Sequence, residues 1–150
     1  MATRGQATLF TIGFTKKSAE RFFGLLRQAG VRRVLDIRLN NSSQLAGFTK
    51  AEDLPYFLSA IAGIDYVYLA QLAPTQEIVD TARKRKDRVA FEKAYRALIE
   101  ERQVEETIDP ALMDGGCLLC SEDRPEECHR RIAAEYLAAR LGNLTVAHLV

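Results

Sequence analysis

The feature that most constrains this chain is an alternation of short β-rich runs with longer segments of helical pattern. Five such runs occur along the 150 residues, at 8–13, 33–38, 65–69, 116–121 and 144–149. The second, fourth and fifth are nearly all apolar at their centres, which is typical of strands covered on both faces. Strands that alternate with helices in this way predict a parallel sheet with helices packed on both of its faces.

Capping residues and apolar stripes locate the helices between these strands. Ser18 is placed to cap a helix that carries an apolar stripe and ends before Gly30. The other predicted helices are one from Asp53 to Gly63 with Pro55 in its first turn, a short one capped by Thr75, and two at 89–104 and about 126–141. We therefore expect residues 1–150 to form a single α/β domain, a three-layer Rossmann-like sandwich with the first strand at the centre of the sheet.

Composition excludes several classes of protein. A chain that is 47% hydrophobic and 27% charged is an ordinary globule rather than a disordered or fibrous one. No window holds the roughly 18 unbroken apolar residues of a membrane helix, and the first residues lack the apolar core of a secretory signal. The net charge of +1 sets up no global field for nucleic acid or membrane. Three cysteines fit a reducing compartment, so we expect a cytoplasmic protein with no membrane partner.

Polar loops follow three of the predicted strands, at 13–18, 36–43 and 120–131. Ligands of open parallel sheets bind beyond the carboxyl ends of the strands, so these loops are expected to converge on one site. The candidate ligand-binding residues in them are Gly13, Phe14, Thr15, Arg38, Asn40, His129 and Arg130. The candidate catalytic residues are Glu122, Asp36 and Cys120.

The charged residues of these loops admit two interpretations. Asp36 and Arg38 lie two apart at a strand end, so their side chains share one face of the sheet. They form either an ion pair that ties the strand end to a neighbouring loop, or a ligand site in which Arg38 binds an anion. In the second case Asp36 and Glu122 are candidates for acid and base on either side of a substrate.

The cysteines do not fit a redox or zinc motif. Cys117 and Cys120 are three apart on a strand and face opposite sides, so Cys117 is expected to be a small buried hydrophobe. Cys120, at the strand exit before a helix N-terminus, is either a nucleophile or a structural cysteine. Cys128 and His129 are adjacent on a helix and diverge by about 100°, which disfavours zinc. Without a dinucleotide fingerprint or a P-loop, no metal and no cofactor is predicted.

Four motifs in this order carry a family resemblance: Thr-Ile-Gly-Phe at 11–14, Leu-Asp-Ile-Arg at 35–38, Leu-Cys-Ser-Glu at 119–122 and Cys-His-Arg at 128–130. The chain resembles the bacterial and archaeal family named domain of unknown function 488. The resemblance implies an α/β fold with these motifs gathered at one site. Many members carry Gly-His-Ser where this chain has Gly13, Phe14 and Thr15, so a role for a histidine there does not transfer.

These observations favour an enzyme that acts on an anionic small molecule or nucleic-acid fragment, because Asp, Glu, Cys, His and Arg together exceed what binding alone demands. Arg38 and Arg130 are expected to bind its charge. One alternative is a non-catalytic nucleotide- or nucleic-acid-binding module, for which the basic run at 83–88 is a candidate contact. Another is a thiol redox sensor centred on Cys120. The sequence leaves the oligomeric state open.

Overall fold

All five predicted strands are present and form one parallel sheet. The computed structural model describes residues 7–39, 47–85, 87–121 and 129–150. The sheet order is β3-β2-β4-β1-β5, with every pair of neighbours parallel. The strands are β1 (Ala7–Gly13), β2 (Arg33–Asp36), β3 (Asp65–Tyr68), β4 (Gly116–Cys120) and β5 (Leu144–Leu149).

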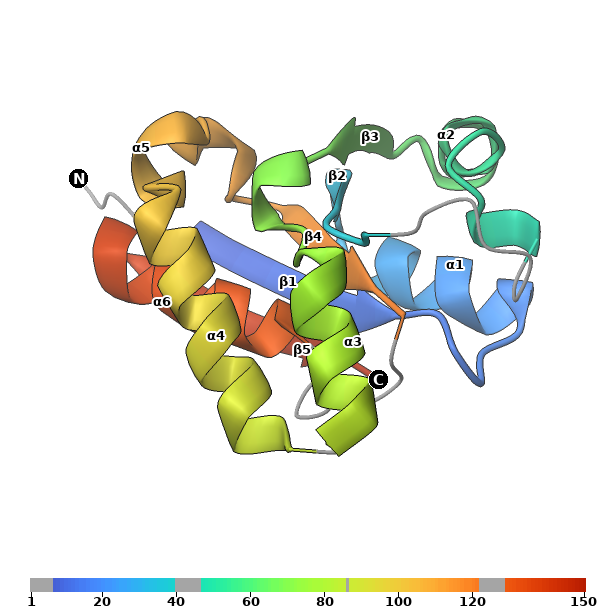
Figure 1. The fold of residues 1–150 in the computed structure, drawn as a ribbon. Helices are drawn as coiled ribbons and strands as arrows, with labels where there is room; N and C mark the ends of the chain where they lie inside the picture. The colour runs from blue at the N-terminus through green and yellow to red at the C-terminus, as the bar shows by residue number, and fades with distance from the viewer. Residues whose placement is uncertain (1–6, 40–46, 86, 122–128) are drawn as a thin grey trace.

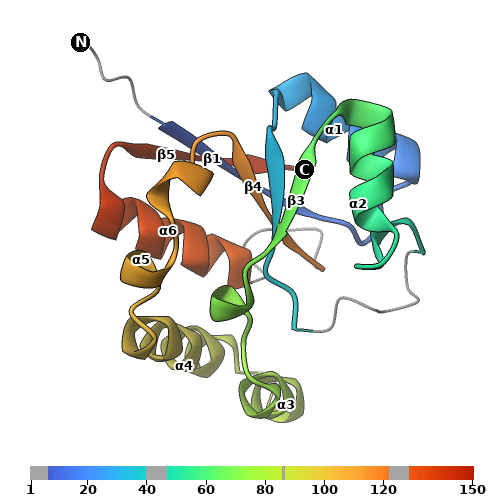
Figure 2. The ribbon, with the colours of Figure 1, turned by 90° about the horizontal axis from the view of Figure 1, so that it is seen from above.

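Helices cover both faces of the sheet, which confirms the three-layer α/β sandwich (Figures 1 and 2). One face is covered by α1 (Ala19–Ala29) and α2 (Leu54–Phe57), the latter continuing as the π-helical turn η2 (Leu58–Ala62). The other side holds α3 (Gln76–Arg85), α4 (Arg88–Glu101), α5 (Val104–Thr107) and α6 (His129–Leu141). Short 3-10 turns lie at η1 (Gly47–Thr49), η3 (Ala70–Leu72) and η4 (Pro110–Leu112).

The helix boundaries follow from local chemistry. The Ser18 side chain accepts a hydrogen bond from the Arg21 amide at the start of α1, and Gly30 ends that helix with a φ of 76°. The Thr75 hydroxyl accepts from the Ile78 amide at the start of α3. Asp53 precedes α2 as expected, although its side chain makes no capping bond. The predicted caps of α1 and α3 are therefore confirmed.

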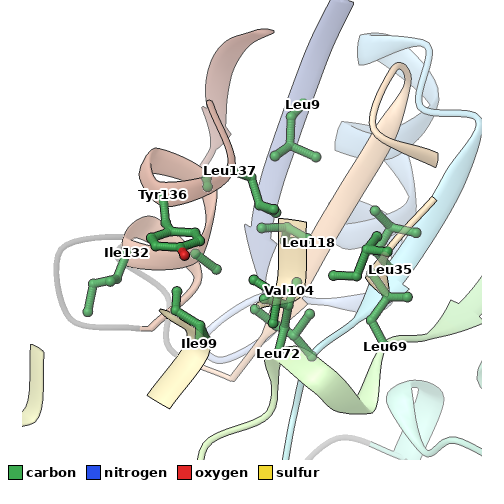
Figure 3. Packing of buried hydrophobic residues seen from close by; sticks show 14 of the residues in the cluster. Leu9, Leu35, Leu69, Leu72, Ile99, Val104, Leu118, Ile132, Tyr136 and Leu137 are labelled. Atoms are coloured by element: carbon green, nitrogen blue, oxygen red, sulfur yellow. The ribbon is translucent and has the colours of Figure 1, made fainter. Parts of the chain in front are cut away.

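Each face of the sheet has its own apolar core because successive strand residues point to opposite sides. The α1/α2 face buries one apolar cluster that includes Ile12, Val34 and Leu119. The α6 face buries a second set, drawn in Figure 3, in which Leu9, Leu35 and Leu118 meet side chains of α4, α5 and α6. The buried residues of α6 include Ile132, Ala133, Tyr136 and Leu137, which confirms the core face expected for the last helix.

Two expectations about the sheet were wrong. The middle strand is β4, which inserts between β1 and β2, whereas the first strand was expected at the centre. The fifth strand is an edge strand whose residues are half-buried or exposed, although its apolar sequence predicted cover on both faces. Both errors concern which strands become neighbours, and this depends on crossovers between distant segments rather than on local pattern.

The strand order creates a switch point between β1 and β4. From β1 the chain crosses over α1 to β2 on one side, and from β4 it crosses over α6 to β5 on the other. The loops that leave these two adjacent strands therefore diverge onto opposite faces, and such a divergence is where open α/β sheets form a ligand crevice. No helix in the parts of the chain that the structure describes is long and apolar enough to cross a membrane.

Candidate functional site

The loops after β1 and β4 are tied together at the switch point. Gly13 and Cys120, the last residues of these strands, are paired in register. Just beyond them, the backbone N–H and the hydroxyl of Thr15 both donate to the Ser121 carbonyl, at 3.0 and 2.6 Å. Lys16 follows with a φ of 66° and an exposed side chain. A non-glycine residue in the left-handed region is uncommon and is found disproportionately at functional sites.

On the α1/α2 face, Asp36 and Arg38 form a closed ion pair. Within the described residues, the Asp36 carboxylate accepts from the Arg38 amide, from Arg38 Nε (2.8 Å) and Nη2 (2.9 Å), and from the Tyr66 hydroxyl (2.5 Å). Arg38 Nη2 also donates to the Thr49 carbonyl at 2.6 Å, and the guanidinium lies over the Phe14 ring. This is the first of the two arrangements expected for Asp36 and Arg38, an ion pair that ties the strand end to a neighbouring segment.

On the opposite face, a fully buried guanidinium lies beside the first strand. Arg130, in the first turn of α6, has an exposed fraction of 0%. Its Nε donates to the Thr11 hydroxyl at 3.2 Å, and that hydroxyl also contacts His148 Nδ1 at 2.6 Å. Thr11 and His148 are register partners on β1 and β5, so one hydroxyl links the helix to two strands.

Next to Arg130, His129 connects the end of β4 to the end of β2. Its Nε2 lies 2.9 Å from the Ile37 carbonyl, and its Nδ1 lies 3.5 Å from Cys120 Sγ. Tyr95 of α4 packs its ring edge-on against the imidazole, with the ring centroids 5.1 Å apart. The side chain of His129 is buried and does not face solvent.

The electrostatic environment keeps His129 neutral. The pKa of His129 is lowered to about 4, mainly by burial; the Arg130 charge also lowers it, and the hydrogen bond to Ile37 and the Asp36 charge partly oppose this. Because a carbonyl oxygen only accepts, the single proton of the neutral ring is on Nε2. Nδ1 therefore presents its lone pair to the sulfur of Cys120.

The two cysteines of β4 face opposite sides of the sheet, as expected. Cys117 is a free thiol in the apolar α1/α2 core, and burial raises its pKa while the charge of Arg130 lowers it. Cys120 points to the α6 face and is disulfide-bonded. The third cysteine of the sequence, Cys128, lies outside the described residues.

The predicted site residues thus gather at one edge of the sheet but in two groups. Asp36, Arg38 and Phe14 pack on the α1/α2 face, while Cys120, His129 and Arg130 pack on the α6 face. Gly13 and Thr15 lie at the switch point between them. Glu122 and Asn40 lie outside the described residues. The catalytic and ligand-binding roles of all these residues stay predictions.

Several residues of this edge were missed by sequence reasoning. Tyr66, the Asp36 partner, lies on a strand that was assigned no site residue. Thr11 is a hydroxyl between apolar residues of its strand, and this signal could have found it because such a group needs a buried partner. Lys16 and Lys17 follow Thr15 directly and were passed over in favour of Arg38 and Arg130, whose exposed fractions are 3% and 0%.

The fold and the polar residues at the carboxyl ends of its strands place the protein in the class of doubly wound parallel α/β proteins. Its switch point lies between the first and fourth strands. The family described as domain of unknown function DUF488 matches residues 18–137. The chain belongs to this family, as its motifs suggested. The comparisons with curated proteins and with solved structures find no match.

Proposed function

We propose that the protein is an enzyme that binds an anionic ligand, of nucleotide or nucleic-acid type, at the switch point between β1 and β4. The observation that carries this proposal is the link between Thr15 and Ser121, which holds together two diverging loops. One of these loops carries the exposed cation Lys16, and Glu122 is the next residue in the sequence after the other. An exposed cation and a sequence-predicted acid/base group that belong to two linked segments suit chemistry on an anion.

The conformation of Lys16 supports this assignment. A φ of 66° is unfavourable for residues other than glycine, yet this loop has a lysine there, shortly before the N-terminus of the eleven-residue α1. Backbone N–H groups at a helix N-terminus and an adjacent lysine both attract anions. The proposal thus transfers the main anion contact from the buried Arg38 and Arg130 to the β1–α1 loop.

In this proposal Asp36 and Arg38 position the loops rather than react. A carboxylate offers about four lone-pair directions, and the donors from Arg38 and Tyr66 occupy all of them on Asp36. Arg38 in turn holds the η1 segment through the Thr49 carbonyl. Glu122 remains the candidate acid or base on sequence grounds. The proposal includes the cytoplasmic location expected from composition.

The test is calorimetric titration of the full chain with inorganic phosphate and a panel of nucleoside monophosphates. Lys16→Ala should weaken binding about tenfold, whereas Lys93→Ala, which removes an exposed lysine from α4, should leave it unchanged. Equal losses in the two variants, or no binding to the wild-type protein at millimolar concentration, would overturn the proposal.

Catalysis is tested separately with Glu122→Gln. The same ligands are incubated with the protein and their products separated by chromatography. An enzyme should lose roughly 10²–10⁴-fold in turnover while its affinity for the ligand stays within about twofold. If the wild-type protein binds ligand and releases no product, it is the non-catalytic binding module instead.

A further inference from the structure

We propose that the outer face of α1 is the interface of a two-fold symmetric dimer, in which α1 packs antiparallel against α1 of a second copy with Gly24 at the crossing point. This inference goes beyond the anion site proposed above, because it uses the exposed stripe of α1 rather than the β1–α1 loop. Three observations support it: a hollow beside α1, a helical glycine that the monomer does not need, and a charge pattern that is complementary to itself.

The hollow lies on the outside of α1 and has a volume of about 600 Å³. It is lined by α1 residues from Ser18 to Gln28 and by Ile61 of η2. The α2–η2 segment and α1 lie next to each other on this side of the sheet (Figure 2). Ile61 is 43% exposed and Leu25 is half-buried, so the hollow presents apolar surface between its charged groups. Burial of such surface is the main favourable contribution when two proteins associate.

Gly24 lies in the middle of α1 and lines this hollow. Glycine is less favourable than alanine inside a helix because it loses more conformational freedom on folding. The backbone of Gly24 does not have a positive φ, and a Cβ built on it would meet no other atom of the chain within 4 Å. Neither backbone conformation nor packing within the monomer therefore requires glycine here. A second helix crossing at this point does, since the missing side chain lets two backbones approach closely.

Glu20 and Arg27 lie about one helical turn before and after Gly24. At about 100° per residue, their side chains lie on the same side of Gly24, within about 20° of each other, and Arg21 and Gln28 lie on its other side. Glu20 and Arg27 are exposed, and neither forms an ion pair with any residue that the structure describes. One stripe of α1 thus carries a carboxylate at one end, a guanidinium at the other and a gap between them.

This pattern matches itself when the second helix runs antiparallel. A two-fold axis that passes between the helices and is perpendicular to both reverses the chain direction and keeps each residue on its own side of the crossing. Glu20 therefore faces Arg27 of the second copy, twice by symmetry, and Arg21 faces Gln28 of the second copy. Arg21 Nη2 already donates to the Val150 carbonyl at 2.6 Å, and the guanidinium has further N–H donors for the Gln28 amide oxygen. A parallel pair would instead set equal charges side by side.

The first experiment measures dimerisation of the full chain by sedimentation velocity, up to a concentration of about 1 mM. Glu20→Arg and Arg27→Glu should each weaken the dimer about tenfold, because each replaces two attractions by two repulsions. An equimolar mixture of the two variants should restore dimerisation, since their heterodimer places opposite charges at both contacts. Glu101→Arg and Lys93→Glu, which reverse exposed charges on α4, should leave the dimer unchanged.

Three results of this experiment would overturn the proposal. The first is a wild-type protein that stays monomeric at about 1 mM. The second is a dimer that the two reversals on α1 weaken no more than the two on α4, which would place the interface elsewhere. The third is a mixture of Glu20→Arg and Arg27→Glu that dimerises no better than either variant alone.

The second experiment uses Gly24→Leu, which the monomer has room to accept. The variant should lose dimerisation, while its thermal unfolding midpoint at concentrations where the chain is monomeric should not fall below that of wild type. Ala97→Leu makes a similar change at an exposed position of α4 and should keep the dimer. A Gly24→Leu variant that dimerises like wild type, or one whose midpoint falls, would refute the role of Gly24.

Discussion

On the α1/α2 face of the sheet the buried charges of Asp36 and Arg38 satisfy each other, whereas on the α6 face His129 turns a lone pair towards a sulfur. Both groups lie at the carboxyl ends of strands of the same sheet and are almost excluded from solvent. The first is closed, because the lone pairs of Asp36 already accept from Arg38 and Tyr66. The second contains a neutral imidazole whose Nε2 lies 2.9 Å from the Ile37 carbonyl and whose Nδ1 lies 3.5 Å from Cys120 Sγ. Burial therefore has different consequences on the two faces, since it encloses a paired set of charges on one and keeps an imidazole neutral on the other.

The largest expected effect comes from breaking the closed pair. Asp36→Asn leaves the Arg38 guanidinium buried without its counter-charge and should lower the free energy of unfolding by roughly 3–5 kcal/mol. Urea unfolding followed by circular dichroism measures this change. The double variant D36L/R38M, which removes both charges, should recover most of the loss. A single variant within about 1 kcal/mol of wild type would show that the pair contributes little.

The next effect is a pH dependence that belongs to the other face. The pKa of His129 is about 4 in the folded protein and about 6.5 when unfolded, so between these values the unfolded chain binds the extra proton. The stability from His129 is complete above about pH 6.5 and should fall by roughly 3 kcal/mol as the pH drops to about 4. Urea unfolding at about pH 7.5 and about pH 4.5, on either side of the unfolded-state pKa, measures this.

Carboxylates also titrate in this pH range, so the control compares the loss of stability on acidification in wild type with that in a His129 variant. His129→Phe should show a smaller loss of stability on acidification than wild type, by the amount that His129 contributes. A loss of the same size in both proteins would mean that His129 is not kept neutral by burial.

The smallest effect sharpens the account of the closed pair. Tyr66→Phe removes the hydroxyl that donates to Asp36 and should cost about 1–2 kcal/mol, since the acceptor is charged. Tyr68→Phe is the matched control on the same strand. The Tyr68 hydroxyl lies 3.4 Å from the Arg38 carbonyl and its side chain is 44% exposed, so its removal should change stability by less than about 0.5 kcal/mol. Chemical unfolding of both variants measures how much the hydrogen bond from Tyr66 to Asp36 contributes to stability.

Much of the fold could be predicted because its signals are local. Ser18, Gly30 and Thr75 act within one helical turn of themselves, so their effects do not depend on the rest of the chain. The alternation of faces along a strand likewise predicted that Cys117 and Cys120 point apart and that Asp36 and Arg38 point together. Each of these inferences needed only the geometry of a single element.

The site was predicted at one edge of the sheet, but its internal pairing was not. That Tyr66 donates to Asp36, or that His129 reaches Ile37, depends on the register of neighbouring strands and on how α6 packs across them. The same limit explains the error in placing β1 at the centre of the sheet. Long-range contacts of this kind leave no periodic signal in a single sequence.

The sequence by itself determined the strands, the capped helices, the family and the edge where polar residues collect, because each of these follows from short-range pattern or motif. Only the tertiary structure decided which polar groups share a face, that Arg38 and Arg130 are buried while Lys16 is exposed, and that the Nδ1 lone pair of His129 meets Cys120. The physical reason is that the protonation state and the pairing of a buried polar group depend on its nearest neighbours in space. These neighbours come from segments that are distant in the chain.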